Sequence, residues 1–194
     1  MTTQAETAPP RTVLHVGCGS PNPAKLHPTF RGGVWKEVRL DIDPAVQPDI
    51  VCDMLDMSVV ATGSVDAVWS SHNVEHLYAH QVPIVLGEFR RVLKHGGFAL
   101  ITLPDLQTVC RYIAEDKLED VLYQSPAGPI HPIDVVYGHR PSIGRGNRFM
   151  AHKTGFTART LRARLVRAGF ARVRVERRGF DLWAVGYRPA PDAS

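Results

Sequence analysis

The sequence predicts an α/β fold in which one domain is built on a mostly parallel β-sheet. Short apolar runs such as residues 13–16 stop abruptly at glycine or acidic residues, which is typical of buried parallel strands. A helical pattern of apolar residues over 81–93 separates two of these runs. The length of 194 residues is enough for one domain with a sizeable core and too short for two ordinary domains.

The first apolar run, residues 12–19, reads T-V-L-H-V-G-C-G. Its glycines, Gly17 and Gly19, allow the backbone to turn sharply and to approach a ligand with no Cβ in the way. A second run, residues 37–40, ends in Asp41, 22 residues after Gly19. At about this spacing the next parallel strand delivers a carboxylate to a ribose diol. These features indicate a nucleoside-containing cofactor at the carboxyl ends of adjacent strands.

The segment after the glycine turn does not fit a dinucleotide. A dinucleotide-binding turn has the pattern G-x-G-x-x-G and opens a helix whose N-terminus holds the pyrophosphate. Here Asn22 stands at the sixth position between two prolines, and residues 20–33 predict a loop with at most one helical turn around 24–26. The site therefore suits a cofactor without a phosphate.

The rest of the chain supplies the remaining elements of the sheet. Residues 49–52, 65–69 and 98–103 are expected strands, and the glycines of His95-Gly96-Gly97 are expected to end the helix over 81–93. A helix is expected over 106–123 and a long loop over 125–153, which is typical of lids and binding loops. A helix over 158–168 follows, with Thr157 as N-cap, and strands 171–178 and 181–187 form a hairpin, so the last strand is antiparallel.

Four of these stretches resemble class I S-adenosylmethionine (SAM)-dependent methyltransferases. V-L-H-V-G-C-G with L-D-I-D resembles their motifs I and II. D-A-V-W-S-S-H-N-V-E-H-L resembles the segment after strand four of the small-molecule, type 11-like subgroup. F-R-R-V-L-K-H-G-G-F-A-L-I-T-L-P resembles the family's sequence of a helix, paired glycines and an apolar strand. The resemblance covers residues 12–104 and 154–188. It implies a Rossmann-like methyltransferase fold with a mostly parallel seven-stranded sheet, an antiparallel last strand, and first crossover helices that are shortened or lost.

The lost crossover helices leave one face of the predicted sheet bare, although parallel sheets normally bury both faces. We expect a second subunit, in a homodimer, or the later insertion to cover this face. The insertion spans about 105–156 within a domain of residues 11–188. Residues 1–10 have no basic or apolar segment of a signal peptide and are expected to be a disordered lead, and residues 189–194 a flexible tail.

The resemblance implies that SAM is the cofactor and S-adenosylhomocysteine the product. It implies that Asp53 reaches the adenine amino group while a neighbouring apolar side chain packs on the ring. The alternative for Asp53 is a turn residue that caps its loop. The residues expected to bind the cofactor follow the ends of the first four strands: Gly17, Cys18, Gly19, Asp41, Ile42, Asp53, Met54, Ser70 and Ser71.

A methyl acceptor with a hydroxyl group needs a general base, and histidine is the usual one. His72 is the first candidate because it follows strand four, and His139 in the insertion is the second. The alternative for His72 is a capping or core polar residue, and His76 is expected to be structural. Residues expected to contact the acceptor are Asn73, Asp105, Tyr137, Arg140, Arg148 and His152. Their arginines suit a carboxylate or phosphate, or else belong to a solvated surface loop.

These observations favour a methyltransferase that acts on an oxygen, nitrogen or carbon atom of a small, anionic acceptor. One alternative is a catalytically idle SAM-binding interaction module. The other is an NAD(P) oxidoreductase, which Asn22 and the prolines beside it disfavour. S-S-H-N stands where N/D-P-P-Y/F would be expected in enzymes that methylate base amines. The absence of N/D-P-P-Y/F speaks against methylation of base amines in a nucleic acid. Residues 139–194 carry 13 Lys/Arg and 3 Asp/Glu, so RNA stays possible as a target of this basic end.

The spacing of the cysteines and the lengths of the apolar runs indicate in which cell compartment the protein is expected. Cys18, Cys52 and Cys110 form no C-x-x-C pair, which argues against a disulfide framework or a zinc site, so no metal is expected. An odd, widely spaced set of cysteines fits a reducing compartment, and we expect the cytoplasm. No apolar run approaches the ~20 residues that a membrane span needs, so no membrane is expected as a partner.

Overall fold

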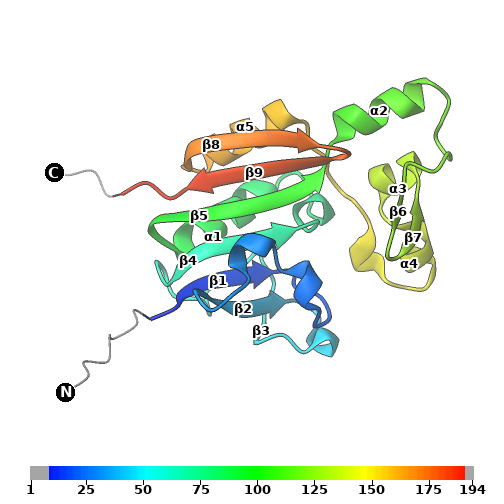
Figure 1. The fold of residues 1–194 in the computed structure, drawn as a ribbon. Coiled ribbons are helices and arrows are strands. Elements are labelled where there is room, and N and C mark those ends of the chain that lie inside the picture. The colour runs from blue at the N-terminus through cyan, green and yellow to red at the C-terminus, as the bar shows by residue number, and fades with distance from the viewer. Residues whose placement is uncertain (1–8, 191–194) are drawn as a thin grey trace, which may run out of the picture.

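The computed structural model describes residues 9–190 and shows an α/β fold around one seven-stranded sheet (Figure 1). The strand order is β3-β2-β1-β4-β5-β9-β8, and β9 is antiparallel to both neighbours, β5 and β8. The predicted fold class is confirmed. Most of the predicted lead and tail lie outside the described residues. The strands are β1 (Arg11–Val16), β2 (Trp35–Asp41), β3 (Ile50–Val51), β4 (Val65–Ser71), β5 (Leu93–Pro104), β8 (Ala171–Arg178) and β9 (Asp181–Tyr187).

The early connections are short, as predicted. Between β1 and β2 the chain forms only two 3-10 turns, η1 (Pro23–Lys25) and η2 (Pro28–Phe30), and between β2 and β3 only η3 (Pro44–Val46). Prolines begin all three turns, and their fixed φ angles suit a first helical position. The side chains of Asn22, His27 and Asp43 cap them by accepting backbone N–H groups.

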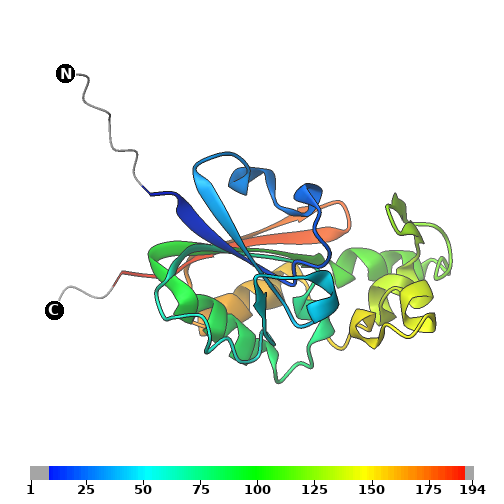
Figure 2. The ribbon, with the colours of Figure 1, turned by 90° about the horizontal axis from the view of Figure 1, so that it is seen from below.

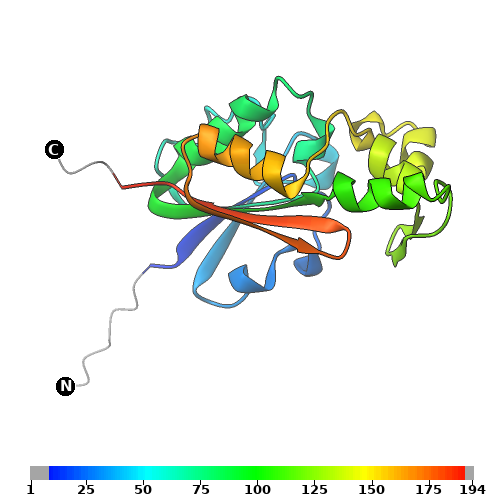
Figure 3. The same cartoon turned by 90° about the horizontal axis from the view of Figure 1, so that it is seen from above.

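One face of the sheet is covered by the helices α1 (Val82–Val92) and α5 (Ala158–Arg167), which lie side by side in Figure 3. Thr157 caps α5 as expected, and its hydroxyl accepts the Thr160 N–H. Apolar side chains of both helices and of the strands form the main core, whose largest fully buried members include Leu14, Leu40, Leu86, Phe89, Ile101, Phe156, Leu161 and Leu165. Burial of this apolar surface is the main force that holds the helices on the sheet.

The opposite face is not bare, because the loop between β1 and β2 folds across it (Figure 2). Leu26 and Phe30 of this loop pack on Trp69, and the Phe30 ring stacks on Phe98 at 5.9 Å. The Trp69 indole N–H donates to the Lys25 carbonyl at 2.9 Å. The expectation that the insertion covers this face is wrong, since large aromatic side chains on a short loop take the place of a crossover helix. The homodimer stays a prediction.

Two boundaries differ from the prediction. Helix α2 (Leu106–Ala114) ends nine residues before Tyr123, because Asp116 adopts a left-handed backbone with φ of 59° that stops the helix. Leu118 and Val121, expected on its buried face, are exposed. The glycines after α1 lie within β5, which already begins at Leu93, and they stand in the irregular stretch between Leu93 and Phe98 where the pairing with β4 shifts register.

The segment after α2 is structured and does not form one long loop. It contains the hairpin β6 (Tyr123–Ser125) and β7 (Gly128–Ile130), helices α3 (Pro132–Tyr137) and α4 (Arg140–Gly144), and the turn η5 (Arg148–Met150). Figure 1 shows these elements beyond the carboxyl ends of β4 and β5. They therefore stand at the edge of the sheet where ligands bind in such folds. Within residues 9–190, no helix is both long and apolar enough to cross a membrane.

Candidate active site

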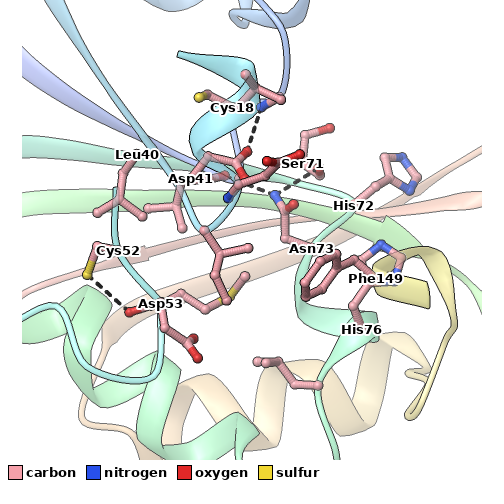
Figure 4. A pocket seen from close by; sticks show the side chains of 18 of the residues that line it. Cys18, Leu40, Asp41, Cys52, Asp53, Ser71, His72, Asn73, His76 and Phe149 are labelled. Atoms are coloured by element: carbon pink, nitrogen blue, oxygen red, sulfur yellow. Dashed lines mark hydrogen bonds between the residues drawn. The ribbon is translucent and has the colours of Figure 1, made fainter. Parts of the chain in front are cut away.

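A cavity of about 560 Å³ lies at the carboxyl ends of β1, β2 and β4 (Figure 4). Its volume is in the usual range for small-molecule sites. The structure brings ten of the predicted residues together in its lining: Gly17, Cys18, Gly19, Asp41, Ile42, Asp53, Met54, Ser71, His72 and Asn73. The cavity therefore lies where the strand order and the glycine turn predicted a cofactor.

The glycine turn at the end of β1 leaves no room for side chains. Gly17 and Gly19 have φ angles of 65° and 59°, which L side chains rarely adopt. A Cβ on Gly17 would lie 2.0 Å from the Asn73 side-chain oxygen. The Asn73 amide is held in place because it donates to the carbonyls of Val16, at 2.9 Å, and Ser71, at 3.0 Å. Asn73 thus supports the turn in addition to lining the cavity.

Asp41 at the end of β2 is tied to the glycine turn. Its Oδ2 accepts the Gly19 N–H at 2.8 Å, and its Oδ1 accepts the Asp43 N–H at 3.0 Å. A carboxylate has about four acceptor positions, so both oxygens can accept further hydrogen bonds from a ligand. Backbone N–H groups therefore orient this carboxylate toward the cavity before any ligand arrives.

The end of β3 forms another wall of the cavity, made by Cys52, Asp53, Met54 and Leu55. Asp53 Oδ1 accepts the Leu55 N–H at 2.9 Å, so this residue caps its own turn while it lines the cavity. Figure 4 shows Cys52 and Asp53 across the cavity from His72 and His76. The wall offers both a carboxylate and apolar side chains, as an adenine base requires.

His72 has an unusual backbone and two acidic neighbours. Its φ is 54°, an outlier for a non-glycine residue of the kind found at functional sites. Nδ1 lies 3.4 Å from Glu75 Oε1, and Nε2 lies 3.7 Å from Asp181 Oδ1. Burial lowers the pKa of His72, but these two carboxylates outweigh it and raise the pKa to about 10. A ring that is protonated at neutral pH cannot accept a proton, which argues against the general-base role in this arrangement.

Fifteen lining residues were not among the predicted sites, and they include His15, Lys25, His76, Phe149, Met150 and Lys153. Lys25 follows a proline-rich loop, and a Cβ on Gly19 would lie 2.5 Å from its Nζ. Only the fold of the loop over the sheet brings this ammonium group to the glycine turn. Phe149 and Met150 lie in residues 125–153, the long segment that was expected to form a lid or binding loop.

Several predicted residues lie outside the cavity lining. Ser70 is buried within β4, and Asp105 is fully buried at the start of α2. Asp105 caps that helix by accepting the Gln107 N–H, and its Oδ2 lies 2.9 Å from the Arg177 guanidinium. Its carboxylate therefore has a structural environment, because both oxygens already have protein partners.

His139 and Arg140 line a separate cavity of about 200 Å³ within the insertion. Arg140 donates to Asp134 at 2.8 Å, and its Nη1 lies 3.2 Å from Glu119. Burial raises the pKa of Asp134, but its hydrogen bonds with Arg140 and His131 lower it to about 2. This group of residues stabilises the insertion and lies apart from the glycine turn.

Tyr137, Arg148 and His152 complete the predicted set. Tyr137 is exposed on α3. Arg148 is also exposed, and its chain neighbours Asn147 and Phe149 both line the large cavity. The Nδ1–H group of His152 donates to the Val135 carbonyl, 2.7 Å away, and the ring packs edge-on against His76 with 4.9 Å between ring centroids. None of these three is among the residues that line the large cavity.

The charges of the cavity lining are distributed unevenly. The lining carboxylates of the described chain, Asp41, Asp43 and Asp53, follow β2 and β3. The lining contributed by residues 71–81 and 147–153 contains none, and it includes Lys153. One part of the cavity is therefore suited to hydroxyl and amino donors, and the other part to a neutral or negatively charged group.

Comparisons with known proteins agree with this geometry. Residues 14–101 match the sequence model of a family described as methyltransferase domain. No curated protein matches the chain. Three solved structures with a similar fold are described next. Each is at most 15% identical to this chain in sequence, so the similarity concerns the fold alone.

A SAM-dependent methyltransferase from Archaeoglobus fulgidus has a TM-score of 0.59 and 14% identity, and the alignment covers 92% of this chain and 86% of that one. An O-methyltransferase family protein from Burkholderia thailandensis has a TM-score of 0.59 and 15% identity over 94% of this chain and 52% of its own. This chain thus spans only about half of that protein.

The third is the 1,6-didemethyltoxoflavin-N1-methyltransferase of Burkholderia thailandensis, whose structure contains S-adenosylhomocysteine. It has a TM-score of 0.58 and 14% identity, and the alignment covers 93% of this chain and 72% of that one. Motifs, family match and fold agree, and the expected resemblance of this chain to the class I SAM-dependent methyltransferases is confirmed.

Proposed function

We propose that this protein transfers a methyl group from SAM to an oxygen, nitrogen or carbon atom of a small, anionic acceptor. The observation that carries the proposal is the one cavity that is lined by the glycine turn, Asp41 and Asp53 and, beside them, by a part that has no carboxylate. The first part suits the cofactor, and the second part suits the acceptor.

The residues present fit SAM. The turn at Gly17 and Gly19 leaves open the space that a Cβ would occupy, and Asp41 presents a preoriented carboxylate to a ribose diol. Asp53 and Met54 form the wall for the adenine, and the Lys25 ammonium group stands beside the turn, where a carboxylate of the cofactor would be neutralised. When bound, SAM supplies an activated methyl group, and the protein supplies position and exclusion of water.

The acceptor is expected between the end of β4 and the insertion. Phe149 and Met150 offer apolar contact there, while Lys153 offers a positive charge to a carboxylate or phosphate. Arg148 is exposed next to this lining and adds to the positive field at its entrance. In this proposal the insertion acts as a lid that holds the acceptor against the cofactor, and alignment of the two reactants is the main source of rate.

The first test is calorimetric titration with S-adenosylhomocysteine, with NADH as the comparison. We expect binding of S-adenosylhomocysteine alone, and loss of it in Gly17→Asp, whose side chain would collide with Asn73. Gly179→Asp is the matched control, because Gly179 has a φ of 61° and no neighbouring atom within 4 Å of a Cβ. Binding of NADH in place of S-adenosylhomocysteine would refute the proposal and favour an oxidoreductase.

The second test is turnover of SAM with a panel of small carboxylates and phosphates, measured as release of S-adenosylhomocysteine. Turnover that is lost in Lys153→Ala would support the anionic acceptor. Tight binding without turnover over the whole panel would favour an idle SAM-binding interaction module. A preference for RNA over small acceptors would contradict the assignment of the acceptor class.

The compartment and the assembly belong to the same proposal. All three cysteines are free, which fits the reducing cytoplasm. A dimeric mass by light scattering at micromolar concentration would support the homodimer.

A further inference from the structure

Three side chains that are far apart in the sequence meet at the edge of the cavity. Glu75 and His76 lie on the turn η4 (Val74–His76), and His152 follows η5 of the insertion. Each offers one potential metal-binding atom, and these atoms all lie within 4.8 Å of one another. The backbone holds the two segments together, because the N–H groups of Lys153 and Thr154 donate to the Glu75 carbonyl at 2.9 and 3.2 Å.

The Glu75 carboxylate is an unusual member of this cluster. Glu75 is 1% exposed, and neither of its side-chain oxygens has a hydrogen-bond partner within the described chain. A buried carboxylate without hydrogen bonds costs several kcal/mol unless a cation compensates it, so such groups are rare. The protonated His72 ring, 3.4 Å from Oε1, compensates part of this charge, and Oε2 is left without a hydrogen-bond partner within the described chain.

The two imidazole rings are oriented like metal ligands. His76 Nδ1 lies 3.2 Å from the Ala151 carbonyl, and His152 Nδ1 lies 2.7 Å from the Val135 carbonyl. Metal-binding histidines usually donate one ring N–H to a carbonyl or carboxylate, which fixes the tautomer and leaves the other nitrogen for the ion. Here that nitrogen is Nε2 on both rings.

We propose that Glu75, His76 and His152 bind one divalent transition-metal ion, for which Zn²⁺ is the representative. Two imidazoles and one carboxylate form a donor set that suits zinc and iron(II) and not magnesium, which prefers oxygen ligands. Ligands of a zinc ion lie about 2.0–2.2 Å from it, so the cluster closes around an ion with movements of about 1 Å. Three protein ligands would leave a further position free for water or substrate, and since His76 lines the cavity, the site adjoins the cavity wall.

The cysteine pattern predicted no metal site, and the cluster contains no cysteine. The ion would join η4 of the core domain to the insertion, in addition to the backbone hydrogen bonds between them. Ion binding is therefore expected to stabilise the folded protein. This inference does not depend on the proposed methyl transfer, because its test measures metal binding alone.

The test uses full-length protein without an affinity tag, freed of metal by a chelator. Calorimetric titration with Zn²⁺ is expected to give one ion per chain and a higher Tm, and Mg²⁺ at the same concentration is expected to give neither. Elemental analysis of untreated protein checks the stoichiometry independently. Absence of stoichiometric Zn²⁺ binding by the folded wild-type protein would overturn the proposal.

Variants locate the ion. Glu75→Gln and His152→Ala are expected to weaken Zn²⁺ binding at least ~100-fold, since loss of even a supporting contact costs 10–100-fold. His80→Ala is the matched control, because His80 is exposed and only four residues from His76, and it is expected to bind as the wild type does. Circular dichroism establishes that each variant is folded, and His152→Gln replaces His152→Ala if the latter is not. Unchanged affinity in Glu75→Gln and His152→Ala would place the ion elsewhere and refute the assignment.

Discussion

Substitution of Gly17 by alanine tests the geometry of the glycine turn most directly. A non-glycine residue with left-handed backbone costs roughly 1–2 kcal/mol. The added Cβ would in addition lie 2.0 Å from Asn73 Oδ1, so the Asn73 side chain has to move. It then loses its hydrogen bonds to the carbonyls of Val16 and Ser71, each worth about 1 kcal/mol. The total expected loss of unfolding free energy is about 3–4 kcal/mol.

Gly179→Ala separates the two contributions. Gly179 lies in the hairpin between β8 and β9 with a φ of 61°, close to the 65° of Gly17, and no atom lies within 4 Å of its added Cβ. This variant is expected to lose only the backbone cost of roughly 1–2 kcal/mol. Urea denaturation followed by circular dichroism measures the unfolding free energy of both variants, and their m-values are expected to equal that of the wild type.

A double-mutant cycle then assigns the difference to Asn73. In an Asn73→Ala background, Gly17→Ala is expected to cost no more than Gly179→Ala does, because the colliding side chain is gone. Equal losses for Gly17→Ala and Gly179→Ala in the wild-type background would refute the reasoning, as would a Gly17→Ala cost that persists without Asn73.

Three further predictions concern other parts of the molecule. Asp41→Asn is expected to weaken S-adenosylhomocysteine binding by about 1.5–3 kcal/mol, since it removes the charge from a hydrogen bond to the ribose, and unchanged affinity in calorimetry would contradict the ribose contact. The pKa of Asp134 is lowered to about 2 despite its burial, so its contribution to stability is present above pH 3.8 and is lost as the pH falls toward 2. Unfolding free energies over this range are expected to fall more steeply for the wild type than for Asp134→Asn, and parallel curves would disprove the assignment. Phe30→Ala is expected to cost about 3–5 kcal/mol in urea denaturation, because Phe30 is 1% exposed and packs the loop on the sheet, whereas a loss below about 1 kcal/mol would mean that the loop is held weakly.

The sheet could be predicted from the sequence because its strands are coded locally. The run that became β1 is apolar at Val13, Leu14 and Val16, and it stops at Gly17 and Gly19, whose positive φ angles form a tight turn. The spacing to Asp41 predicted a carboxylate beside that turn, and the hydrogen bond from the Gly19 N–H confirms that the two meet. Where local signals competed, the prediction was wrong. Helix α2 stops early because the backbone of Asp116 is left-handed, a conformation that aspartate tolerates better than most residues. The apolar residues beyond Asp116 continue the helical pattern, so the sequence gives no sign of this stop.

The amino-acid sequence by itself determined the fold class, the glycine turn and the chain segments that line the cavity beside that turn, because each depends on neighbours in the chain. Only the tertiary structure decided that Lys25 stands beside Gly19, that Asp105 and Arg140 have structural partners, and that His139 lies in a separate cavity. It alone also brought Glu75 and His76 to His152, 76 residues later in the chain. Such contacts depend on how a loop or an insertion packs on the sheet, and no periodicity or spacing along the chain encodes that packing.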